Sequence, residues 1–484
     1  MTAAPLVVGF DLDMTLIDTR PGFAACLTAL GEEAGVAFDV AALVERLGPP
    51  LDVMLAPYFP HHGPDHVSGL VDRFRELYPA IAVPPTLAFD GAHAALAAVR
   101  SHGGRTILIT GKYTPNARLH VDALGLDVDE VVGEVWGHGK GPVLAEHGAG
   151  VYVGDHVHDV EGALAAGILS VSVLTGGCTE QELVDAGTHA VLPDLTAFPD
   201  WLDEHLLGMR LGALEERLRG LGSVLVAFSG GADSAFLLAA AVRALGPGQV
   251  VAATGYSDSL PQSERDPARE LAESLGVEVV TPTTREMERE GYRANAGDRC
   301  FFCKAELLDV LVPLAAERGM AYVATGTNAD DAVAGFRPGI RAAAERGAIT
   351  PLCDAGLTKA QVREASRRWG LPTWDKPAAA CLSSRVAYGI EVTPFRLARV
   401  ERAEAACRGT LADAGIPVRD LRVRDLGERA SVEVDVDLLS DRLAPGSAAA
   451  QALLDAVRRC GFDAADLDPK GFRSGSMNEA LVEQ

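Results

Sequence analysis

Two apolar segments, VVGF near the start of the sequence and SVLVAF more than 200 residues later, each run directly into a short polar loop. The first loop is Asp11-Leu-Asp13-Met-Thr15, and the second is Ser229-Gly-Gly-Ala-Asp-Ser234. In open α/β sheets, residues at the carboxyl ends of the strands face the crevice where ligands bind. The chain is therefore predicted to fold into two successive α/β units, each with a ligand site of its own.

The distribution of charge supports a division near residue 205. Residues 1–205 contain 9 lysines and arginines against 28 acidic residues, whereas residues 206–484 contain 34 against 39. Such a shift suggests two units with different ligands, and we place the boundary between Pro199 and Gly212. The net charge of −24 argues against docking on nucleic acid or on a membrane surface.

Cysteine usage and hydropathy indicate the compartment. No apolar run approaches the ~18 residues of a membrane span, and the segment Leu6–Phe10 is interpreted as a first strand instead of a signal peptide. Eight cysteines without dense regular spacing indicate reduced thiols. We therefore expect a cytoplasmic protein without membrane or nucleic-acid partners, and we expect a homo-oligomer.

Polar residues follow successive strand-like segments of the first unit in an ordered set. They are Asp11 and Asp13 after VVGF, Thr110 and Lys112 after RTILI, Lys140 in the turn GHGKGPV, and Asp155 with Asp159 after VYV. Paired carboxylates suit phosphoryl transfer, because one can attack phosphorus while its neighbour handles the leaving-group proton. Carboxylate oxygens are also the ligands that Mg²⁺ prefers. The set predicts a magnesium-dependent phosphatase or phosphotransferase.

This set resembles the haloacid dehalogenase (HAD) phosphatases, in particular the phosphoglycolate phosphatase and pyrophosphatase branch. The resemblance covers residues 1–205 and implies a Rossmann-like domain with a helical cap at about residues 18–84. For single residues it implies Asp11 as nucleophile, Asp13 as general acid/base, Thr110 and Lys140 as phosphoryl-binding groups, and Asp11, Asp13, Asp155 and Asp159 around the metal. A regulatory domain that keeps only the scaffold remains an alternative.

The loop after SVLVAF suits phosphate binding, because two glycines let the backbone approach closely and the helix that follows offers free N–H groups. It lacks the GxxxxGK[ST] pattern of a Walker A loop. It resembles instead the PP-loop ATP pyrophosphatases, which cleave ATP between the α- and β-phosphates and leave an adenylated substrate. The residues implied to bind ATP are Ser229, Gly230, Gly231, Asp233 and Ser234. In the later segment GTNADD, Asp330 or Asp331 is a candidate for assisting Mg²⁺.

Four further segments of the second unit narrow this resemblance. They are Asp298-Arg-Cys300-Phe-Phe-Cys303-Lys304, Phe336-Arg337-Pro-Gly-Ile-Arg341, Lys376-Pro-Ala-Ala-Ala-Cys381-Leu-Ser-Ser384-Arg385, and LRVRDLGERASVEVD with Arg422 and Arg424. Together they resemble the LarE family of sulfur transferases, which act in nickel-pincer cofactor biosynthesis. The resemblance covers about residues 207–484. It implies that a carboxylate of pyridinium-3,5-biscarboxylic acid mononucleotide is adenylated and then attacked by the Cys381 thiolate. Elimination would leave the sulfur on the substrate and dehydroalanine in the chain.

Several residues of the second unit are candidates for supporting roles. Planar, multi-donor cations suit the phosphate and carboxylates of such a substrate, and the candidates are Arg337, Arg341, Arg385, Arg422 and Arg424. Glu401 and Glu404, on a predicted helix, are candidates for the eliminating base or are exposed helix charges. The pair Cys300 and Cys303 is compatible with a zinc half-site, a redox pair, part of a 4Fe-4S cluster, or two packed thiols. Cys353, Cys381 and Cys407 are spare candidates for a cluster.

The predicted architecture is therefore α/β throughout: a HAD domain at 1–205, a PP-loop domain at 206–388 and a smaller α/β sulfur-transferase domain at 389–484. We expect ATP and Mg²⁺ as cofactors, a small nucleotide as substrate, and enzymes of the nickel-pincer pathway as partners. Because the two units are adjacent in one chain, a further hypothesis is that the HAD unit hydrolyses the pyrophosphate that the PP-loop unit releases. Alternatives are a PP-loop tRNA thiolase, a nucleotide-binding scaffold with one inactive unit, and a synthetase of the amidotransferase type.

Overall fold

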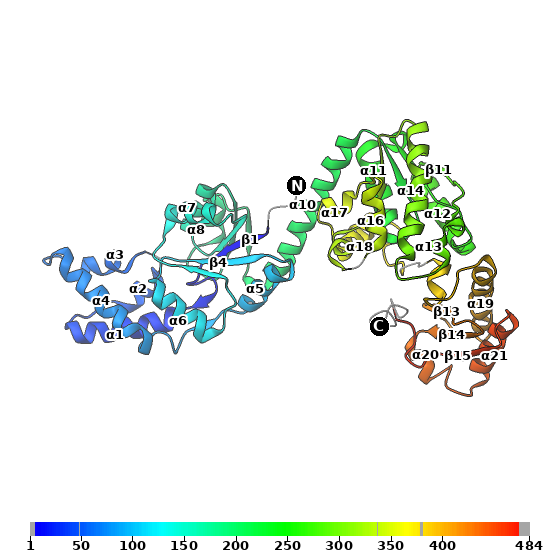
Figure 1. Cartoon of the computed structure of the whole chain (residues 1–484). Coiled ribbons are helices and arrows are strands. Elements are labelled where there is room, and N and C mark those ends of the chain that lie inside the picture. The colour runs from blue at the N-terminus through cyan, green and yellow to red at the C-terminus, as the bar shows by residue number, and fades with distance from the viewer. Residues whose placement is uncertain (1–4, 48, 336, 378–380, 474–484) are drawn as a thin grey trace. The chain divides into compact units, whose positions relative to one another are not determined.

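The computed structural model describes residues 5–47, 49–335, 337–377 and 381–473. The chain divides into two compact units, Met1–Leu206 and Leu207–Gln484 (Figure 1). Phe336 and Ala378–Ala380, which belong to two of the motifs quoted above, lie outside the described residues. Within the described part of the chain, no helix combines the length and hydropathy that a membrane crossing requires.

Unit 1 is built on a six-stranded parallel sheet with the strand order β5-β4-β1-β6-β7-β8. The strands are β1 (Val7–Phe10), β4 (Arg105–Ile109), β5 (Glu130–Val132), β6 (Val151–Gly154), β7 (Leu169–Val173) and β8 (Ala190–Leu192). The central strands β1 and β6 are buried along their whole length. Their near-continuous apolar sequence is typical of parallel strands that are covered on both faces.

Helices cover both faces of this sheet. They are α5 (Ala92–Ser101), α6 (Thr114–Leu124), α7 (Lys140–Glu146), α8 (Val157–Ala166) and α9 (Glu180–Asp185). Alternate strand residues enter two separate cores: Val8 and Leu108 belong to one cluster, and Val7 and Ile107 belong to the other. This alternation follows from the two-residue repeat of a β-strand.

A helical cap is inserted after β1. It consists of α1 (Arg20–Ala34), α2 (Val40–Glu45), α3 (Leu51–Leu55) and α4 (Pro64–Ile81), and a short antiparallel ribbon of β2 (Ile17–Asp18) and β3 (Leu87–Ala88) joins it to the sheet domain. The cap has an apolar core of its own, which includes Phe23 and Phe74 in edge-to-face contact. Figure 1 shows the four helices grouped away from α7 and α8.

The boundary between the units falls inside one helix, α10 (Phe198–Leu221). Leu202 and Leu206 pack in the main core of unit 1, whereas Leu214 and Leu218 pack in the main core of unit 2. The predicted boundary between Pro199 and Gly212 therefore lies within a helix whose apolar residues are divided between two cores.

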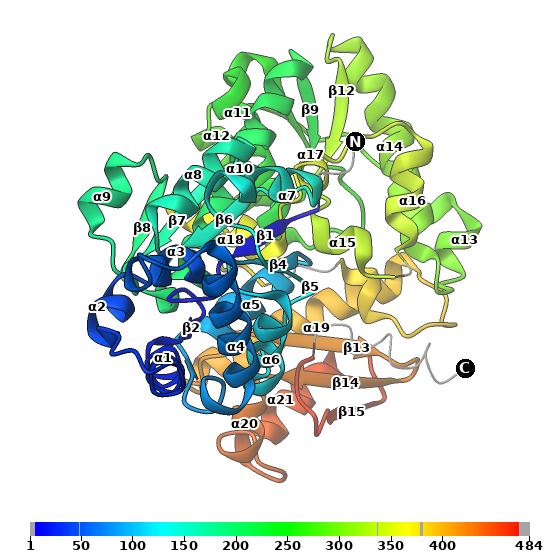
Figure 2. The same ribbon diagram turned by 90° about the vertical axis from the view of Figure 1, so that its left-hand side faces the viewer.

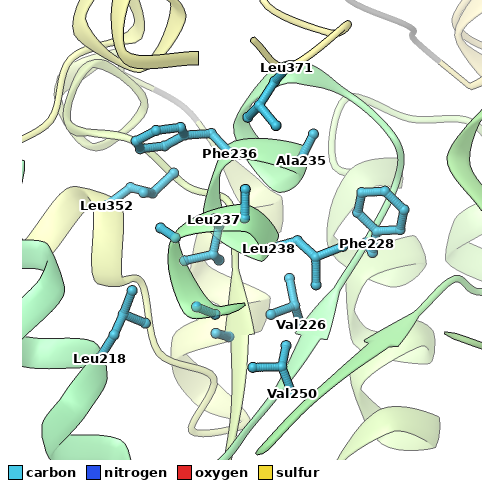
Figure 3. Packing of buried hydrophobic residues seen from close by; sticks show 14 of the residues in the cluster. Leu218, Val226, Phe228, Ala235, Phe236, Leu237, Leu238, Val250, Leu352 and Leu371 are labelled. Carbon is cyan, nitrogen blue, oxygen red and sulfur yellow. The ribbon is translucent and has the colours of Figure 1, made fainter. Parts of the chain in front are cut away.

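Unit 2 begins with a four-stranded parallel sheet in the order β11-β10-β9-β12. The strands are β9 (Val224–Ala227), β10 (Val250–Ala253), β11 (Glu278–Val280) and β12 (Tyr322–Thr325). Around it lie α11 (Ala232–Leu245), α12 (Gln262–Ser274), α13 (Glu290–Arg293), α14 (Arg299–Glu317), α15 (Ala329–Val333), α16 (Pro338–Glu345), α17 (Pro351–Asp354) and α18 (Lys359–Arg368). Figure 3 shows the apolar residues of α11 packed against Val226 and Val250 of the strands.

The C-terminal part of unit 2 contains a three-stranded sheet (Figure 2). Strand β13 (Leu421–Asp425) is antiparallel to β14 (Arg429–Val434), which is parallel to β15 (Ala464–Leu467). The helices are α19 (Pro394–Asp413), α20 (Val436–Ser440) and α21 (Ala448–Arg459). The predicted succession of a capped parallel α/β fold, a second parallel α/β fold and a small α/β region is confirmed.

Candidate active sites

The first candidate site lies at the carboxyl edge of the unit 1 sheet, where three neighbouring strands end. Asp11 follows β1, Thr110 follows β4 and Asp155 follows β6. The Asp11 N–H donates to the carbonyl of Val153 at 2.8 Å, so the strand ladder fixes the backbone of Asp11. The Thr110 hydroxyl accepts the N–H of Lys112 at 3.2 Å. Parallel pairing therefore brings together residues that are far apart in the sequence.

Three carboxylates converge at this edge. Asp11, Asp155 and Asp159 are buried, and each places one oxygen within 4.8 Å of the others. Lys140, at the start of α7, donates to Asp11 at 2.9 Å and to Asp159 at 2.6 Å. Burial raises the pKa of Asp11 to about 7 and the pKa of Asp155 well above its usual range. One ammonium does not balance three buried carboxylates, and this oxygen set fits a hard divalent cation such as Mg²⁺.

Lys140 is held by a network that the sequence did not reveal in full. Burial alone would lower the pKa of Lys140, but the charges of Asp11 and Asp159 hold it well above its usual range. The Tyr152 hydroxyl accepts from Lys140 at 2.8 Å and donates to the carbonyl of Ile109 at 2.7 Å. The only sequence signal for Tyr152 is a phenol within an otherwise aliphatic strand.

Two glycines make room for the carboxylates. A β-carbon at Gly176 would lie 1.8 Å from an oxygen of Asp155, and one at Gly154 would lie 2.4 Å from the Asp159 carboxylate. Only glycine allows these approaches. Thr15 donates to the other oxygen of Asp155 at 2.9 Å, which fixes the orientation of that carboxylate. Gly176 was missed in the sequence because its role depends on where Asp155 points.

Asp13 lies apart from the three clustered carboxylates and contacts the cap side of the site. It forms an ion pair with Lys112 at 2.9 Å, and Lys112 donates to the hydroxyl of Tyr78 on cap helix α4 at 2.6 Å. Tyr78 is also hydrogen-bonded to His120 at 3.0 Å, and burial lowers the pKa of His120 to about 4. The structure thus places Asp13 with Lys112, whereas the other three residues predicted around the metal form one group.

A cavity of about 730 Å³ connects these groups to the cap. Its floor contains Asp11, Asp13, Thr110 and Lys140, and its roof contains apolar cap residues such as Phe59. A buried nucleophile, a second carboxylate, two cations and a divalent-ion site at the end of one cavity are the components of phosphoryl transfer through a covalent aspartyl intermediate.

The second candidate site surrounds the loop between β9 and α11. Ser229 and Ser234 are hydrogen-bonded to each other through their hydroxyls at 3.1 Å, and Ser234 donates to the carbonyl of Gly231 at 3.1 Å. Gly230 has a φ of 70°, a conformation that favours glycine. A β-carbon at Gly326, in the GTN segment, would lie 2.8 Å from the Ser234 nitrogen. The loop is therefore closely covered by the end of β12.

Two lysines contact this loop. Lys359 donates to Asp233 at 2.7 Å, and Lys376 donates to the carbonyl of Gly230 at 3.0 Å and to Glu264 at 2.6 Å. The chain contains only six lysines, and two of them contact this one loop. Neither lysine could be assigned to the ATP site from the sequence, since both come from segments far downstream of the loop.

A cavity of about 340 Å³ joins the loop between β9 and α11 (Ser229–Ser234, the phosphate loop) to two of the predicted cysteines. Ser229, Gly231 and Asp233 line it together with Cys303 and Cys381. Asp331 also lines this cavity, whereas Asp330 accepts the N–H of Lys359. The phosphate loop and Cys381 therefore line the same cavity.

Three cysteine thiols lie within electrostatic range of one another. Burial raises the pKa of Cys300 and that of Cys303, and the charge of Cys381 is the next largest contribution to both. Cys300 and Cys303 occupy the first turn of α14. Among the described residues, the only group of three or more acidic, histidine or cysteine residues with ligand atoms within 4.8 Å of one another is Asp11, Asp155 and Asp159. The three thiols are thus more widely spread than the ligands of a single ion.

Arg385, Arg422 and Arg424 form one group beside Cys381. Arg385 donates to the Cys381 carbonyl at 2.8 Å and pairs with partly buried Glu404 at 2.9 Å. Arg424 donates to the carbonyl of Ser384 at 3.2 Å. Burial, followed by the charge of Arg385, lowers the pKa of Arg422. Arg424 also pairs with buried Glu433 at 2.6 Å. A cluster of three guanidinium groups is suited to binding an anion.

The remaining predicted residues lie elsewhere. Arg337 and Arg341 have exposed side chains and pair with Asp331 and Glu345 at 3.7 Å. Glu401 accepts the N–H of Gln262 at 2.7 Å, at the first residue of α12. The structure therefore does not bring these two arginines into the group around Glu404, and it gives Glu401 a helix-capping contact.

Comparison with known families agrees with the division into two units. Residues 8–164 match the family model of haloacid dehalogenase-like hydrolases, and residues 143–198 match a second HAD-hydrolase-like model. Residues 211–427 match the model described as asparagine synthase.

Individual relatives divide in the same way. The chain is 33% identical over 276 residues to pyridinium-3,5-bisthiocarboxylic acid mononucleotide synthase of Lactiplantibacillus plantarum, covering 57% of this chain and 96% of that protein. It is 38% identical over 277 residues to an uncharacterised protein of Synechocystis sp., covering 57% of this chain and all of that protein. It is 30% identical over 218 residues to phosphoglycolate phosphatase of Xylella fastidiosa, covering 41% of this chain and 94% of that protein.

Proposed function

Since the chain belongs to the haloacid dehalogenase-like hydrolases through its first unit and to the LarE family of PP-loop enzymes through its second, we propose that it is a bifunctional enzyme. The second unit transfers sulfur to pyridinium-3,5-biscarboxylic acid mononucleotide at the expense of ATP, in nickel-pincer cofactor biosynthesis. The first unit is a Mg²⁺-dependent phosphohydrolase. The observation that carries the sulfur-transfer proposal is the cavity shared by the phosphate loop and Cys381.

The shared cavity supports a two-step activation. A substrate carboxylate attacks the α-phosphorus of ATP and releases pyrophosphate, while the N–H groups around Gly231 and the ammonium of Lys376 hold phosphate oxygens. The Cys381 thiolate then attacks the acyl adenylate and releases AMP. A base removes the α-proton of Cys381, the Cβ–S bond breaks, and the thiocarboxylate leaves dehydroalanine in the chain. Formation of thiolated nucleotide by the purified chain with ATP and Mg²⁺ tests this sequence.

Arg385 and Glu404 support the position of Cys381. Arg385 bridges the Cys381 carbonyl and the Glu404 carboxylate, and Glu404 also accepts the N–H of Val423 at 3.2 Å. These contacts favour a positioning role for Glu404 in addition to its predicted role as base. Glu401 is less suited to proton abstraction because it caps α12.

The arginine group supplies a prediction about substrate binding. An Arg422→Ala variant is expected to raise the KM for the pyridinium nucleotide about 30-fold, because charge-assisted hydrogen bonds contribute roughly 2 kcal/mol each. The KM for ATP is expected to change little. Steady-state kinetics with each substrate varied in turn measures both effects. Arg341→Ala is the control, since that side chain is exposed, and an equal loss in both variants would contradict the grouping.

A 4Fe-4S cluster on Cys300, Cys303 and Cys381 is a second candidate for the sulfur donor. Such clusters are held by cysteine thiolates, and the charge of Cys381 acts on both other thiols. Such a cluster would supply a replaceable sulfide, so that Cys381 need not lose its own sulfur. Iron analysis of anaerobically purified protein separates the two routes: a cluster predicts about four irons per chain and the sacrificial route predicts none.

In the first unit, the geometry supports hydrolysis through an aspartyl phosphate. Asp11 attacks phosphorus, and Asp13 protonates the departing alkoxide and then deprotonates the attacking water. Lys140 and Thr110 hold the transferred group. Asp11, Asp155 and Asp159 would hold Mg²⁺, which offsets negative charge on the phosphoryl oxygens when bound.

Mg²⁺ is expected to stabilise unit 1 against heat in a pH-dependent manner. The pKa of Asp11 is about 7 in the folded chain and lower in the unfolded chain, so between these values only the folded chain keeps the proton. Without metal, the free energy of unfolding therefore falls as the pH rises toward 7. A Mg²⁺ concentration 100 times the Kd at pH 8 should raise the Tm of unit 1 by roughly 5 °C at that pH. The same concentration should raise it by less at pH 6, where protons compete with the ion for the carboxylates. Calorimetry of the full chain, with Asp155→Asn as the control that loses the shift, measures this effect. An equal shift in the control would contradict the assignment of the ion site.

Other expectations remain proposals on the same basis. The nickel-pincer enzymes are proposed as pathway partners, and cytoplasmic location and homo-oligomerisation remain predictions. A tRNA thiolase would share adenylation and cysteine sulfur, and a gel shift of tRNA at moderate salt would favour it. A nucleotide-binding scaffold with one inactive unit would bind nucleotide, but that unit would not catalyse turnover.

A further inference from the structure

Three rings form a continuous row at the edge of the unit 1 cavity. The ring of Trp136 lies 4.1 Å from that of His158, and the ring of His158 stacks on that of His156 at 4.7 Å between centroids. All three residues line the cavity of about 730 Å³. The row therefore offers flat ring surface beside the charged groups at the floor of the cavity.

The row also lies next to the phosphoryl-binding groups. A β-carbon at Gly111 would be 3.5 Å from the Trp136 ring, and Gly111 directly follows Thr110. At the other end, His156 directly follows Asp155. The rings thus extend from the end of β4 to the end of β6, beside the place where a phosphate would be held. Trp136 is 38% exposed, so its ring is accessible to a ligand.

The size and lining of the cavity do not match a small anion. Pyrophosphate and phosphoglycolate are compact and polar, whereas the roof of the cavity contains Phe23, Met54 and Phe59. A volume of about 730 Å³ is in the range that encloses a ligand of drug size. A substrate that left the roof and the rings uncovered would forgo most of the apolar contact that the cavity offers.

We infer that the first unit hydrolyses nucleoside monophosphates, with the flat ring of the nucleoside stacked on Trp136 at the exposed end of the ring row. The inference rests on the phosphohydrolase activity proposed above and specifies its substrate class. Asp11 forms a bond to phosphorus, the P–O ester bond breaks, and the nucleoside alkoxide takes the proton of Asp13. Water then releases inorganic phosphate from Asp11.

This substrate class connects the two units chemically. The reaction proposed for unit 2 involves two ring-bearing monophosphates, the pyridinium mononucleotide and the AMP released from the acyl adenylate. Either would place a planar heterocycle on the rings and its phosphate at Asp11. The ring row thus favours a mononucleotide over pyrophosphate as the substrate, and replaces the hypothesis based on adjacency alone.

The test uses the full chain with Mg²⁺ and without ATP. Phosphate release is measured with AMP, nicotinic acid mononucleotide, phosphoglycolate and pyrophosphate. We expect kcat/KM for at least one mononucleotide to exceed that for phosphoglycolate and for pyrophosphate by about tenfold or more, and the better mononucleotide identifies the ring. A Trp136→Ala variant should lose about tenfold on the mononucleotides, in line with the effect of removing one stacking ring. Its activity on phosphoglycolate should change less than about twofold.

Two variants separate stacking from a folding defect. Trp136→Phe keeps a ring and should restore most of the mononucleotide activity, whereas Trp374→Ala removes an exposed tryptophan of unit 2 and should change nothing. Equal losses on all substrates in Trp136→Ala, or pyrophosphate as the best substrate, would overturn the inference and leave the phosphohydrolase standing. No turnover of any of the four compounds would overturn both.

Discussion

A Cys381→Ala substitution is expected to reduce formation of the thiolated pyridinium nucleotide by about 1,000-fold or more, because it removes the sulfur that the account assigns to transfer. Adenylation should persist, since the phosphate loop is unchanged, so pyrophosphate should still appear when ATP and substrate are supplied. Product is measured by mass spectrometry of the small-molecule fraction, and pyrophosphate by a coupled assay.

Cys353→Ala is the matched control for this experiment. Cys353 is another partly buried thiol of unit 2, on α17, and is not among the residues that line the shared cavity. Its replacement should leave sulfur transfer within about twofold of the wild type, as expected for a site away from the reacting groups. Wild-type product yield from Cys381→Ala would refute the donor assignment.

The second large effect concerns Asp11. An Asp11→Asn variant should lose phosphatase activity by about 1,000-fold or more, because the amide cannot form the aspartyl phosphate. Sulfur transfer should persist, since Asp11 lies in unit 1 and the sulfur-transfer residues lie in unit 2. Release of phosphate from the substrates of the first unit, measured beside the sulfur-transfer assay on the same preparation, checks both statements.

Asp13→Asn provides a sharper comparison within the same site. Its proposed role is to protonate the leaving group, so the loss should be large on alkyl phosphates and smaller on p-nitrophenyl phosphate, whose leaving group needs no proton. The difference between the two kinds of ester is expected in the first step, in which the aspartyl phosphate forms. With p-nitrophenyl phosphate, this step is measured as the burst of p-nitrophenol. An equal loss on both kinds of ester would contradict the acid role.

The residues at strand ends were predictable from the sequence for a topological reason. Parallel strands end at one edge of a sheet, so polar residues that follow β1, β4 and β6 had to gather there, as Asp11, Thr110 and Asp155 do. Gly176 could not be predicted in this way. It is one of 51 glycines, and its role appears only once the position of the Asp155 carboxylate is known.

Long-range packing explains the remaining differences. Five arginines were predicted as candidates for substrate binding, but Arg385 and Arg424 are buried and pair with Glu404 and Glu433, whereas Arg341 is exposed on α16. Sequence spacing does not reveal which arginines lose solvent. The contact between Lys112 and Tyr78 likewise depends on how the cap helix α4 meets the sheet domain. The fold was more predictable than the site because strand and helix patterns are local, whereas these contacts join distant segments.

Sacrificial sulfur transfer from Cys381 is tested by the intact mass of the protein before and after incubation with ATP, Mg²⁺ and pyridinium-3,5-biscarboxylic acid mononucleotide. We expect the wild-type chain to lose the mass of one H₂S as Cys381 becomes dehydroalanine, and the Cys381→Ala protein to keep its mass. Thiolated product formed without any change in protein mass would contradict the sacrificial route and favour a cluster at Cys300, Cys303 and Cys381 as the sulfur donor.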